Sequence, residues 1–154
     1  MPRASAASKA PPTGAPAPAG CTALRFRKAA RRVSQIYDAF LAPHDLTITQ
    51  FGLLAHIERL PDSSIGALAT ELVMDPTTLT RNLAPLRQRR LVALRPDAHD
   101  RRARTLRLTA AGRAALERGR AGWEEAQSHM ARVLGPDHGP LSAAIDTMLE
   151  RLGS

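Results

Sequence analysis

The stretch DPTTLTRNLAPLRQRRLV, residues 75–92, contains the helix around which the chain is organised. Asp75 is a residue type that caps helices, and Pro76 suits the first helical position because its missing N–H would have no partner there. Three leucines then recur at helical spacing and predict one buried stripe. They are Leu79, Leu83 and Leu86. The pattern predicts an amphipathic helix that begins at residue 76.

The opposite face of this helix carries hydroxyl, amide and guanidinium groups and no carboxylate. It can therefore approach a phosphate-lined groove without charge repulsion. Threonine hydroxyls bind phosphates or base edges, and arginine can donate two hydrogen bonds to guanine. The candidate contacts on this face and its flanks are Thr77, Thr78, Thr80, Arg81, Arg87 and Gln88. The alternative interpretation is a solvated surface helix that lacks acidic residues.

Patterns on both sides of this helix extend it into a larger motif. Residues 65–73, IGALATELV, predict a short helix that meets it at a tight turn, which gives a helix-turn-helix. Residues 92–95, VALR, and residues 104–108, RTLRL, are interpreted as alternating apolar and polar side chains with the basic ones on one side, which predicts two short strands. The hydrophilic loop between them, PDAHDRRA, contains Arg101 and Arg102. Together the two strands and the loop predict a β-hairpin wing.

Apolar residues at helical spacing predict four further helices. Two precede the helix-turn-helix, over residues 22–42 and 47–60, and Thr49 is the expected cap of the second. Two follow the wing, over residues 110–133 and 141–152. A winged helix has a complete core without the helices at the two chain ends. We therefore expect their apolar stripes to form a dimerisation region.

The expected fold class is mainly α with a small β wing: a winged helix-turn-helix plus a helical dimerisation region built from both chain ends. The DNA-binding region is assigned to residues 46–108, and the dimerisation helices to residues 21–45 and 109–154. Residues 1–20 are mostly Ala, Pro, Ser and Gly without an apolar period, so they are expected to form a disordered tail.

The charge distribution favours double-stranded DNA as the partner. The chain has a formal net charge of +8 and a pI of about 11.3. Residues 72–108 alone contain nine arginines and three aspartates. Clustered positive charge of this kind is typical of nucleic-acid-binding proteins. A membrane-surface role would need an exposed apolar face beside the basic one. The leucine stripe is better used as core, so no membrane partner is expected.

Several other classes of protein are excluded by the sequence. Cys21 is the only cysteine, so an intrachain disulfide is impossible. No apolar run approaches the ~20 residues of a membrane span, and the N-terminal residues lack the apolar region of a signal peptide. We therefore expect a cytoplasmic protein. The chain shows no metal-ligand spacing, no Ser–His–Asp grouping and no Gly-rich phosphate loop, so neither an enzyme nor a cofactor is expected.

Three segments resemble the MarR family of bacterial transcription regulators. They are LTITQFGLLAHI (residues 46–57), IGALATELVMDPTTLTRNLAPL (65–86) and DRRARTLRLTAAG (100–112). The last is the most specific, because Asp-x-Arg in the wing, a strand and then Leu-Thr-x-x-Gly is typical of that family. The resemblance spans roughly residues 22–152 and implies a homodimer on a pseudo-palindromic operator. It also implies repression that is released by a small phenolic or aromatic effector, or by cysteine oxidation.

The resemblance also suggests roles for individual residues. The helix that begins at residue 76 would lie in the major groove. Its base contacts would be Thr77, Thr78 and Arg81, and its phosphate contacts Thr80, Arg87 and Gln88. The wing would reach the adjacent minor groove, where Arg102 enters, Asp100 orients that arginine and Arg101 adds a contact.

The sequence leaves open two alternatives to a repressor that is released from DNA by a small effector. Cys21 precedes the first helix and lies near Arg25, a position that suits an oxidant-sensing thiol. The plain interpretation of Cys21 is a small apolar residue at an interface. The second alternative is a winged-helix protein-interaction module, in which the basic face is solvated surface.

Three residues depart from the family pattern. Arg90 and Asp45 stand where the family usually has glycine, after the recognition helix and before the second helix. If these positions need a left-handed backbone, Asp45 tolerates it better than Arg90. Pro85 lies inside the recognition helix and is expected to kink it, because proline removes a backbone donor.

Overall fold

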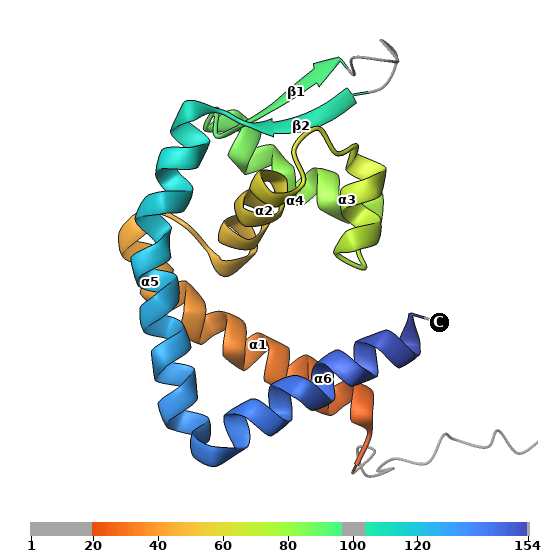
Figure 1. Ribbon diagram of the computed structural model, residues 1–154, viewed down its shortest axis with the longest axis vertical. Helices are drawn as coiled ribbons and strands as arrows, with labels where there is room; N and C mark the ends of the chain where they lie inside the picture. The colour runs from red at the N-terminus through yellow and green to blue at the C-terminus, as the bar shows by residue number, and fades with distance from the viewer. Residues whose placement is uncertain (1–19, 97–103, 154) are drawn as a thin grey trace, which may run out of the picture.

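The computed structural model describes residues 20–96 and 104–153, so all but the last residue of the expected N-terminal tail lies outside the described residues. The secondary structure is mainly helical, with two strands (Figure 1). The elements in chain order are α1 (Thr22–Leu41), η1 (Ala42–His44), α2 (Ile48–Arg59), α3 (Ile65–Glu71), α4 (Pro76–Gln88), β1 (Val92–Pro96), β2 (Arg104–Leu108), α5 (Ala110–Leu134), η2 (Gly135–Asp137) and α6 (His138–Leu152). This is the expected class of fold, a winged helix-turn-helix with additional helices.

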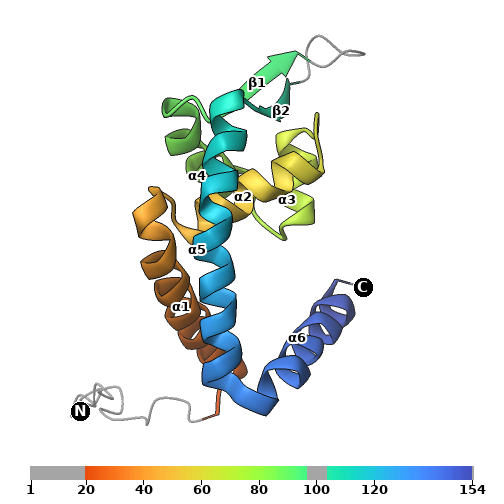
Figure 2. The same cartoon turned by 60° about the vertical axis from the view of Figure 1, so that its left-hand side comes forward.

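The molecule is elongated, and α5 runs along its length. Helices α2, α3 and α4 gather at one end beneath the two-stranded wing, while α1 and α6 lie toward the other end (Figure 1). Turning the view shows that α6 diverges from α1 (Figure 2). The winged helix-turn-helix, or reading head, is thus joined to the remaining helices mainly through α5.

The main hydrophobic core lies inside the reading head. It draws on α2, α3, α4, the wing and the first half of α5. Its fully buried side chains include Leu54, Leu68, Leu79, Leu83, Leu86, Leu106 and Leu116. A smaller cluster joins α1 to α5 through Tyr37, Ala126 and Met130. Trp123 packs against both clusters and stacks on Phe51 with ring centroids 6.0 Å apart, so it connects the two cores.

The start of α2 differs from the sequence prediction. Thr47, not Thr49, caps the helix: its hydroxyl accepts from Gln50 N at 3.2 Å, and the Gln50 side chain accepts from Thr47 N at 3.2 Å. This capping box satisfies two N–H groups at once. A cap at Thr49 could not form one, because the third helical residue would then be Gly52, which has no side chain to reach back. Asp38 Oδ1 accepts from Ile48 N at 2.7 Å, which ties α1 to the same helix start.

Two other helix ends differ from the sequence prediction by more than one residue. Helix α3 stops at Glu71, two residues earlier than expected, because Val73 adopts a left-handed conformation (φ 51°). Helix α6 begins at His138, three residues earlier than expected, so Pro140 lies inside its first turn. Proline is tolerated there because N–H groups of a first turn have no intrahelical partner.

The wing is an antiparallel ladder in which Val92 pairs with Leu108 and Leu94 with Leu106. A third segment joins its inner edge, because Ser64 forms an isolated bridge with Thr105. The wing is therefore paired with the chain that leads into α3.

Candidate nucleic-acid interface

The recognition helix α4 is oriented by its cap and by its buried stripe. Asp75 Oδ1 accepts from Thr77 N at 2.9 Å and from Thr78 N at 3.1 Å, as the sequence predicted. The three leucines of the stripe are at most 1% exposed. Because they are fixed in the core, the opposite face of α4 points outward.

All six residues predicted as contacts on α4 are exposed. Their donors are largely uncommitted: among residues 20–96 and 104–153, neither Arg81 nor Arg87 forms an ion pair. The Thr80 hydroxyl donates to Pro76 O at 2.8 Å, so to contact a phosphate it must turn its proton away from that carbonyl. This face therefore offers free guanidinium and hydroxyl groups.

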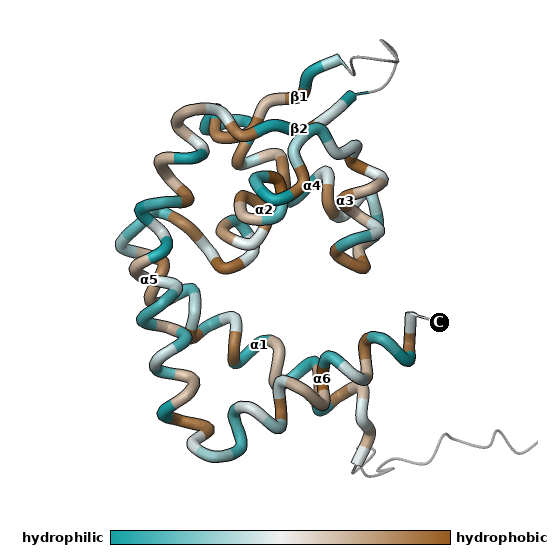
Figure 3. The backbone as a smooth tube through the Cα atoms, viewed as in Figure 1, coloured by the Kyte–Doolittle hydropathy of each residue, from teal (hydrophilic) through white to brown (hydrophobic). Residues whose placement is uncertain are grey.

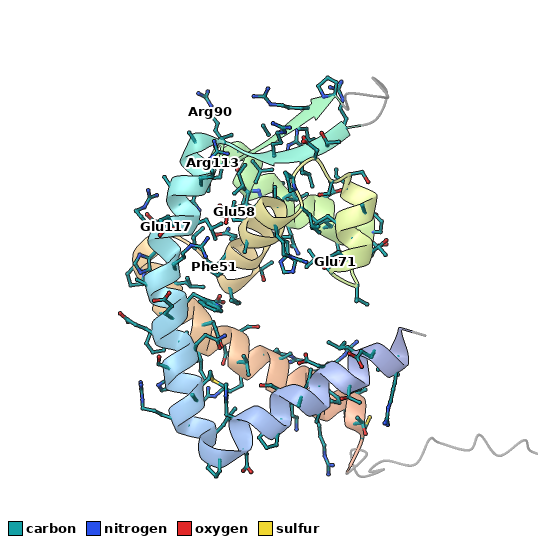
Figure 4. The ribbon with its side chains drawn as sticks, in the orientation of Figure 1. Phe51, Glu58, Glu71, Arg90, Arg113 and Glu117 are labelled. Atoms are coloured by element: carbon teal, nitrogen blue, oxygen red, sulfur yellow. The ribbon has the colours of Figure 1, made fainter. Side chains whose placement is uncertain are left out.

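The end of α4 explains why Arg90 tolerates an unfavourable backbone. Arg90 has a φ of 57°, Arg90 N donates to Arg87 O at 2.9 Å, and Leu91 N donates to Leu86 O at 2.8 Å. These two bonds and the buried Leu86 and Leu91 make a Schellman motif, which normally takes glycine at the left-handed position. Helix α4 runs through Pro85 without a break. Figure 4 places Arg90 beside the start of α5.

Two other helix ends use the same motif without glycine. At η1, Asp45 N donates to Ala42 O at 3.0 Å and Leu46 N to Leu41 O at 3.4 Å. After α3, Val73 N donates to Thr70 O at 3.1 Å. Asp45 and Arg90, which stand where the family usually has glycine, both have a left-handed backbone. Val73 also has one, and the sequence analysis did not predict it.

Two pairs that sequence reasoning missed connect segments of the chain that lie far apart in the sequence. Arg89, the cap of α4, donates from Nη1 to Asp45 O at 2.7 Å, across 44 residues of chain. Arg107 forms an ion pair with Asp62, on the segment before α3. No local pattern marks either pair, because each is created by the folding of distant segments.

The wing loop lies outside the described residues. Asp100, Arg101 and Arg102 are therefore not placed by the structure. The strands that lead to the loop are placed, and their ends carry the exposed Arg95 and Arg104. These arginines extend the basic surface toward the wing tip.

Cys21 lies at the other end of the molecule, at the N-cap position of α1. Its side chain makes no capping hydrogen bond and is half-buried. Within the described ranges, no group of three or more His, Cys, Asp or Glu could hold a metal ion, and no helix is long and apolar enough to cross a membrane.

A capped helix-turn-helix followed by a β-hairpin defines a winged-helix protein. A model of the MarR family matches residues 44–103. The solved transcriptional regulator MosR of M. tuberculosis, in complex with DNA, is 36% identical over 86% of this chain and 98% of its own, with a TM-score of 0.72. The repressor CouR, bound to a 23-mer DNA duplex, is 26% identical over 88% of this chain and 94% of its own, with a TM-score of 0.73.

BpsR of Bordetella bronchiseptica shares the fold, at 23% identity over 92% of this chain and 99% of its own, with a TM-score of 0.74. A comparison with curated proteins found no match. The chain belongs to the MarR family of transcription regulators.

Proposed function

We propose that this protein is a sequence-specific DNA-binding transcriptional repressor that works as a homodimer. The observation that carries this proposal is the outer face of α4, where free guanidinium and hydroxyl groups are held outward by a buried leucine stripe. The solved structures of MosR in complex with DNA and of the repressor CouR bound to a DNA duplex support DNA binding by this chain.

Within this proposal, α4 lies in the major groove of the DNA. Thr77, Thr78 and Arg81 contact bases, while the phosphate contacts are Thr80, Arg87 and Gln88. The wing carries Arg101 and Arg102 to the adjacent minor groove, where Asp100 orients Arg102. Two-fold symmetry of the dimer requires half-sites about 10 bp apart, one turn of the double helix.

The apolar surface of α1 and α6 supports a homodimer, which is typical of the family. The stripe on α1 is covered by α5 at Tyr37 (9% exposed) and left open toward the N-terminus at Phe26 (40%) and Val33 (36%). Helix α6 has no buried residue and exposes Leu149 (52%). Figure 3 shows apolar segments along both helices. A second copy would remove this surface from water.

We infer that a small phenolic or aromatic effector releases the DNA. This rests on the family resemblance, and oxidation of Cys21 is the other route. The two routes are separated by Cys21→Ser, assayed with and without peroxide. If binding by the unaltered protein survives peroxide, release does not depend on the thiol. If peroxide abolishes it and Cys21→Ser is resistant, Cys21 is the sensor.

The experiment that tests DNA binding begins with the protein selecting duplexes from a random-sequence pool. Affinity for the selected duplex is then measured over a range of salt concentrations, beside a shuffled duplex. We expect a strong preference for the selected duplex and a steep fall in affinity with salt, because several phosphates are neutralised. If no duplex is selected, the protein-interaction alternative replaces this proposal.

A further inference from the structure

The wing depends on a third segment for its position. A two-stranded hairpin alone is marginally stable in water. Here the segment before α3 adds an edge to the hairpin: Asp62 N donates to Leu106 O at 3.2 Å, and Leu106 N donates to Ser63 O at 2.9 Å. Thr105, which bridges to Ser64, is 4% exposed although it is polar. The base of the wing is thus held by the chain that starts the helix-turn-helix.

A side-chain pair closes this junction. Arg107 donates from Nε to Asp62 Oδ1 and from Nη2 to Asp62 Oδ2, so the contact is a two-bond fork between planar groups. Asp62 is held with a φ of 62°, a left-handed conformation that aspartate tolerates better than most residues. The fork therefore fixes both a turn and a strand, 45 residues apart in the chain.

The fork joins the wing to the recognition helix through a short path. Asp62 precedes Ser64, whose hydroxyl caps α3 by accepting from Ala67 N at 3.1 Å. Helix α3 leads through one turn into α4, while Arg107 lies opposite Ala93 in the wing ladder. One end of the fork thus belongs to the helix-turn-helix and the other to the wing.

We propose that Asp62 and Arg107 are positioning residues that hold the wing at a fixed angle to α4, so that helix and wing reach their two grooves at the same time. This inference rests on the proposed DNA binding. It assigns the pair no contact with bases. Both side chains are about half exposed, at 43% for Asp62 and 53% for Arg107.

An exposed ion pair contributes little to global stability. Its geometric effect is larger, because the paired strand ends at Pro96 and Arg104 lie beyond Arg107 along the ladder and a small change of angle at the base displaces them. The hydrogen bonds that Arg107 donates to the Asp62 carboxylate lower the pKa of Asp62 and raise the pKa of Arg107. The pair therefore stays charged at neutral pH.

The test asks whether Asp62→Asn raises or lowers the affinity for the selected duplex. This change removes a negative charge from a DNA-binding protein, so electrostatics alone predicts tighter binding. Loss of wing positioning predicts the opposite, about a tenfold weaker affinity for the selected duplex. The matched control is Glu71→Gln. Glu71 pairs with Arg59 between α3 and α2, and its side chain is also 43% exposed. This control should bind as tightly as the parent or more tightly.

A DNA footprinting experiment distinguishes a misplaced wing from a destabilised protein. With Asp62→Asn, cleavage protection should be lost at the outer flanks reached by the wing and kept in the major-groove half-sites. Arg107→Gln should give the same pattern, and the double variant should be no weaker than either single variant, because all three break one fork. The midpoint of thermal unfolding should stay close to that of the parent.

Three outcomes would overturn the inference. The first is that Asp62→Asn binds the selected duplex as tightly as the parent. The second is that only Arg107→Gln weakens binding, which would make Arg107 a direct phosphate contact. Equal loss of protection over the whole site would indicate unfolding of the reading head. Failure of the parent to select any duplex is a different result, because it removes the proposed function itself.

Discussion

Gly112 lies directly against the backbone of Leu91: a Cβ at Gly112 would be 2.0 Å from the Leu91 carbonyl oxygen. Thr109 contacts the same segment, since its hydroxyl donates to Arg90 O at 2.7 Å and accepts from Gly112 N at 3.0 Å. Helix α5 therefore begins on the residues that end the recognition helix. This close contact gives a physical reason for the spacing Leu-Thr-x-x-Gly at residues 108–112.

Gly112→Ala should destabilise the protein by about 1–3 kcal/mol, because the added methyl group meets backbone that cannot move away easily. Urea unfolding measures the change. The control is Gly52→Ala in α2, where a Cβ would have no atom within 4 Å. Alanine is the better helix former, so the control should be neutral or stabilising by up to about 1 kcal/mol. Equal stability of the two variants would contradict the contact.

Val73→Gly should stabilise the reading head. Val73 is 86% exposed and has a φ of 51°, so it buries little apolar surface while a β-branched side chain occupies a left-handed position. Removing that strain should gain about 1 kcal/mol, less the greater backbone entropy of glycine in the unfolded chain. The midpoint of urea unfolding should rise, and Val73→Ala, which keeps a Cβ, should show little of this gain.

The helix-turn-helix and the wing strands could be predicted from the sequence, because the patterns that indicate them lie within short segments of the chain. The Asp75 cap, the leucine stripe of α4 and the alternating strands all act within a few residues of one another. The choice between Thr47 and Thr49 at the start of α2 was wrong for a related reason. Either threonine can cap a helix, and the decision depends on Gln50 reaching back to Thr47 N.

The connections between elements could not be predicted from the sequence. Arg89 and Asp45 are separated by 44 residues, and Arg107 and Asp62 by 45, so no repeat or spacing marks them. Arginines of this kind were interpreted only as part of a basic segment. The structure shows that some guanidinium groups in that segment bond to distant parts of the reading head, while Arg81 has no ion-pair partner among the described residues.

The free energy of unfolding should fall at high pH because of the ionisation of Tyr37. Burial raises the pKa of its phenol, whose hydroxyl donates to Gln127 Oε1. A raised pKa in the folded state means that folding favours the neutral form. This stability is complete below the ordinary tyrosine pKa of about 10 and is lost as pH rises through the raised value.

Tyr37 is the only tyrosine in the chain, so the ultraviolet absorbance of the phenolate reports it alone. The titration midpoint should be higher in the folded protein than in denaturant. Tyr37→Phe should remove this part of the alkaline loss of stability. Equal midpoints in folded and unfolded protein would show that the phenol is solvated.

Removal of residues 138–154 should convert the protein to a monomer. Helix α6 has no buried residue in the single chain, so its loss should leave the core of the reading head intact. It would, however, delete the exposed Leu141, Leu149 and Leu152 from the proposed shared surface. Light scattering gives the mass. Removal of residues 1–19 is the matched control and should leave the dimer unchanged. A dimer that survives loss of α6 would place the interface elsewhere.

The helix and the wing should contribute to DNA binding in different ways. Arg81 lies on α4 opposite the buried leucines and is exposed without an ion-pair partner in the described chain, so we expect it to contact a base edge. Arg81→Ala should cost about 1–3 kcal/mol on the selected duplex and little on a shuffled one. Discrimination at one position in each half-site should relax.

Arg102, in the wing loop, should respond to phosphate and groove width more than to sequence. Arg102→Ala should therefore weaken the selected and shuffled duplexes by similar factors. It should also make the salt dependence shallower by about one unit per phosphate no longer neutralised. Salt titrations of both variants on both duplexes measure these effects. If Arg81→Ala weakens both duplexes equally and Arg102→Ala spares the shuffled one, the wing reads sequence and the helix anchors the protein, because only a base contact distinguishes the two duplexes.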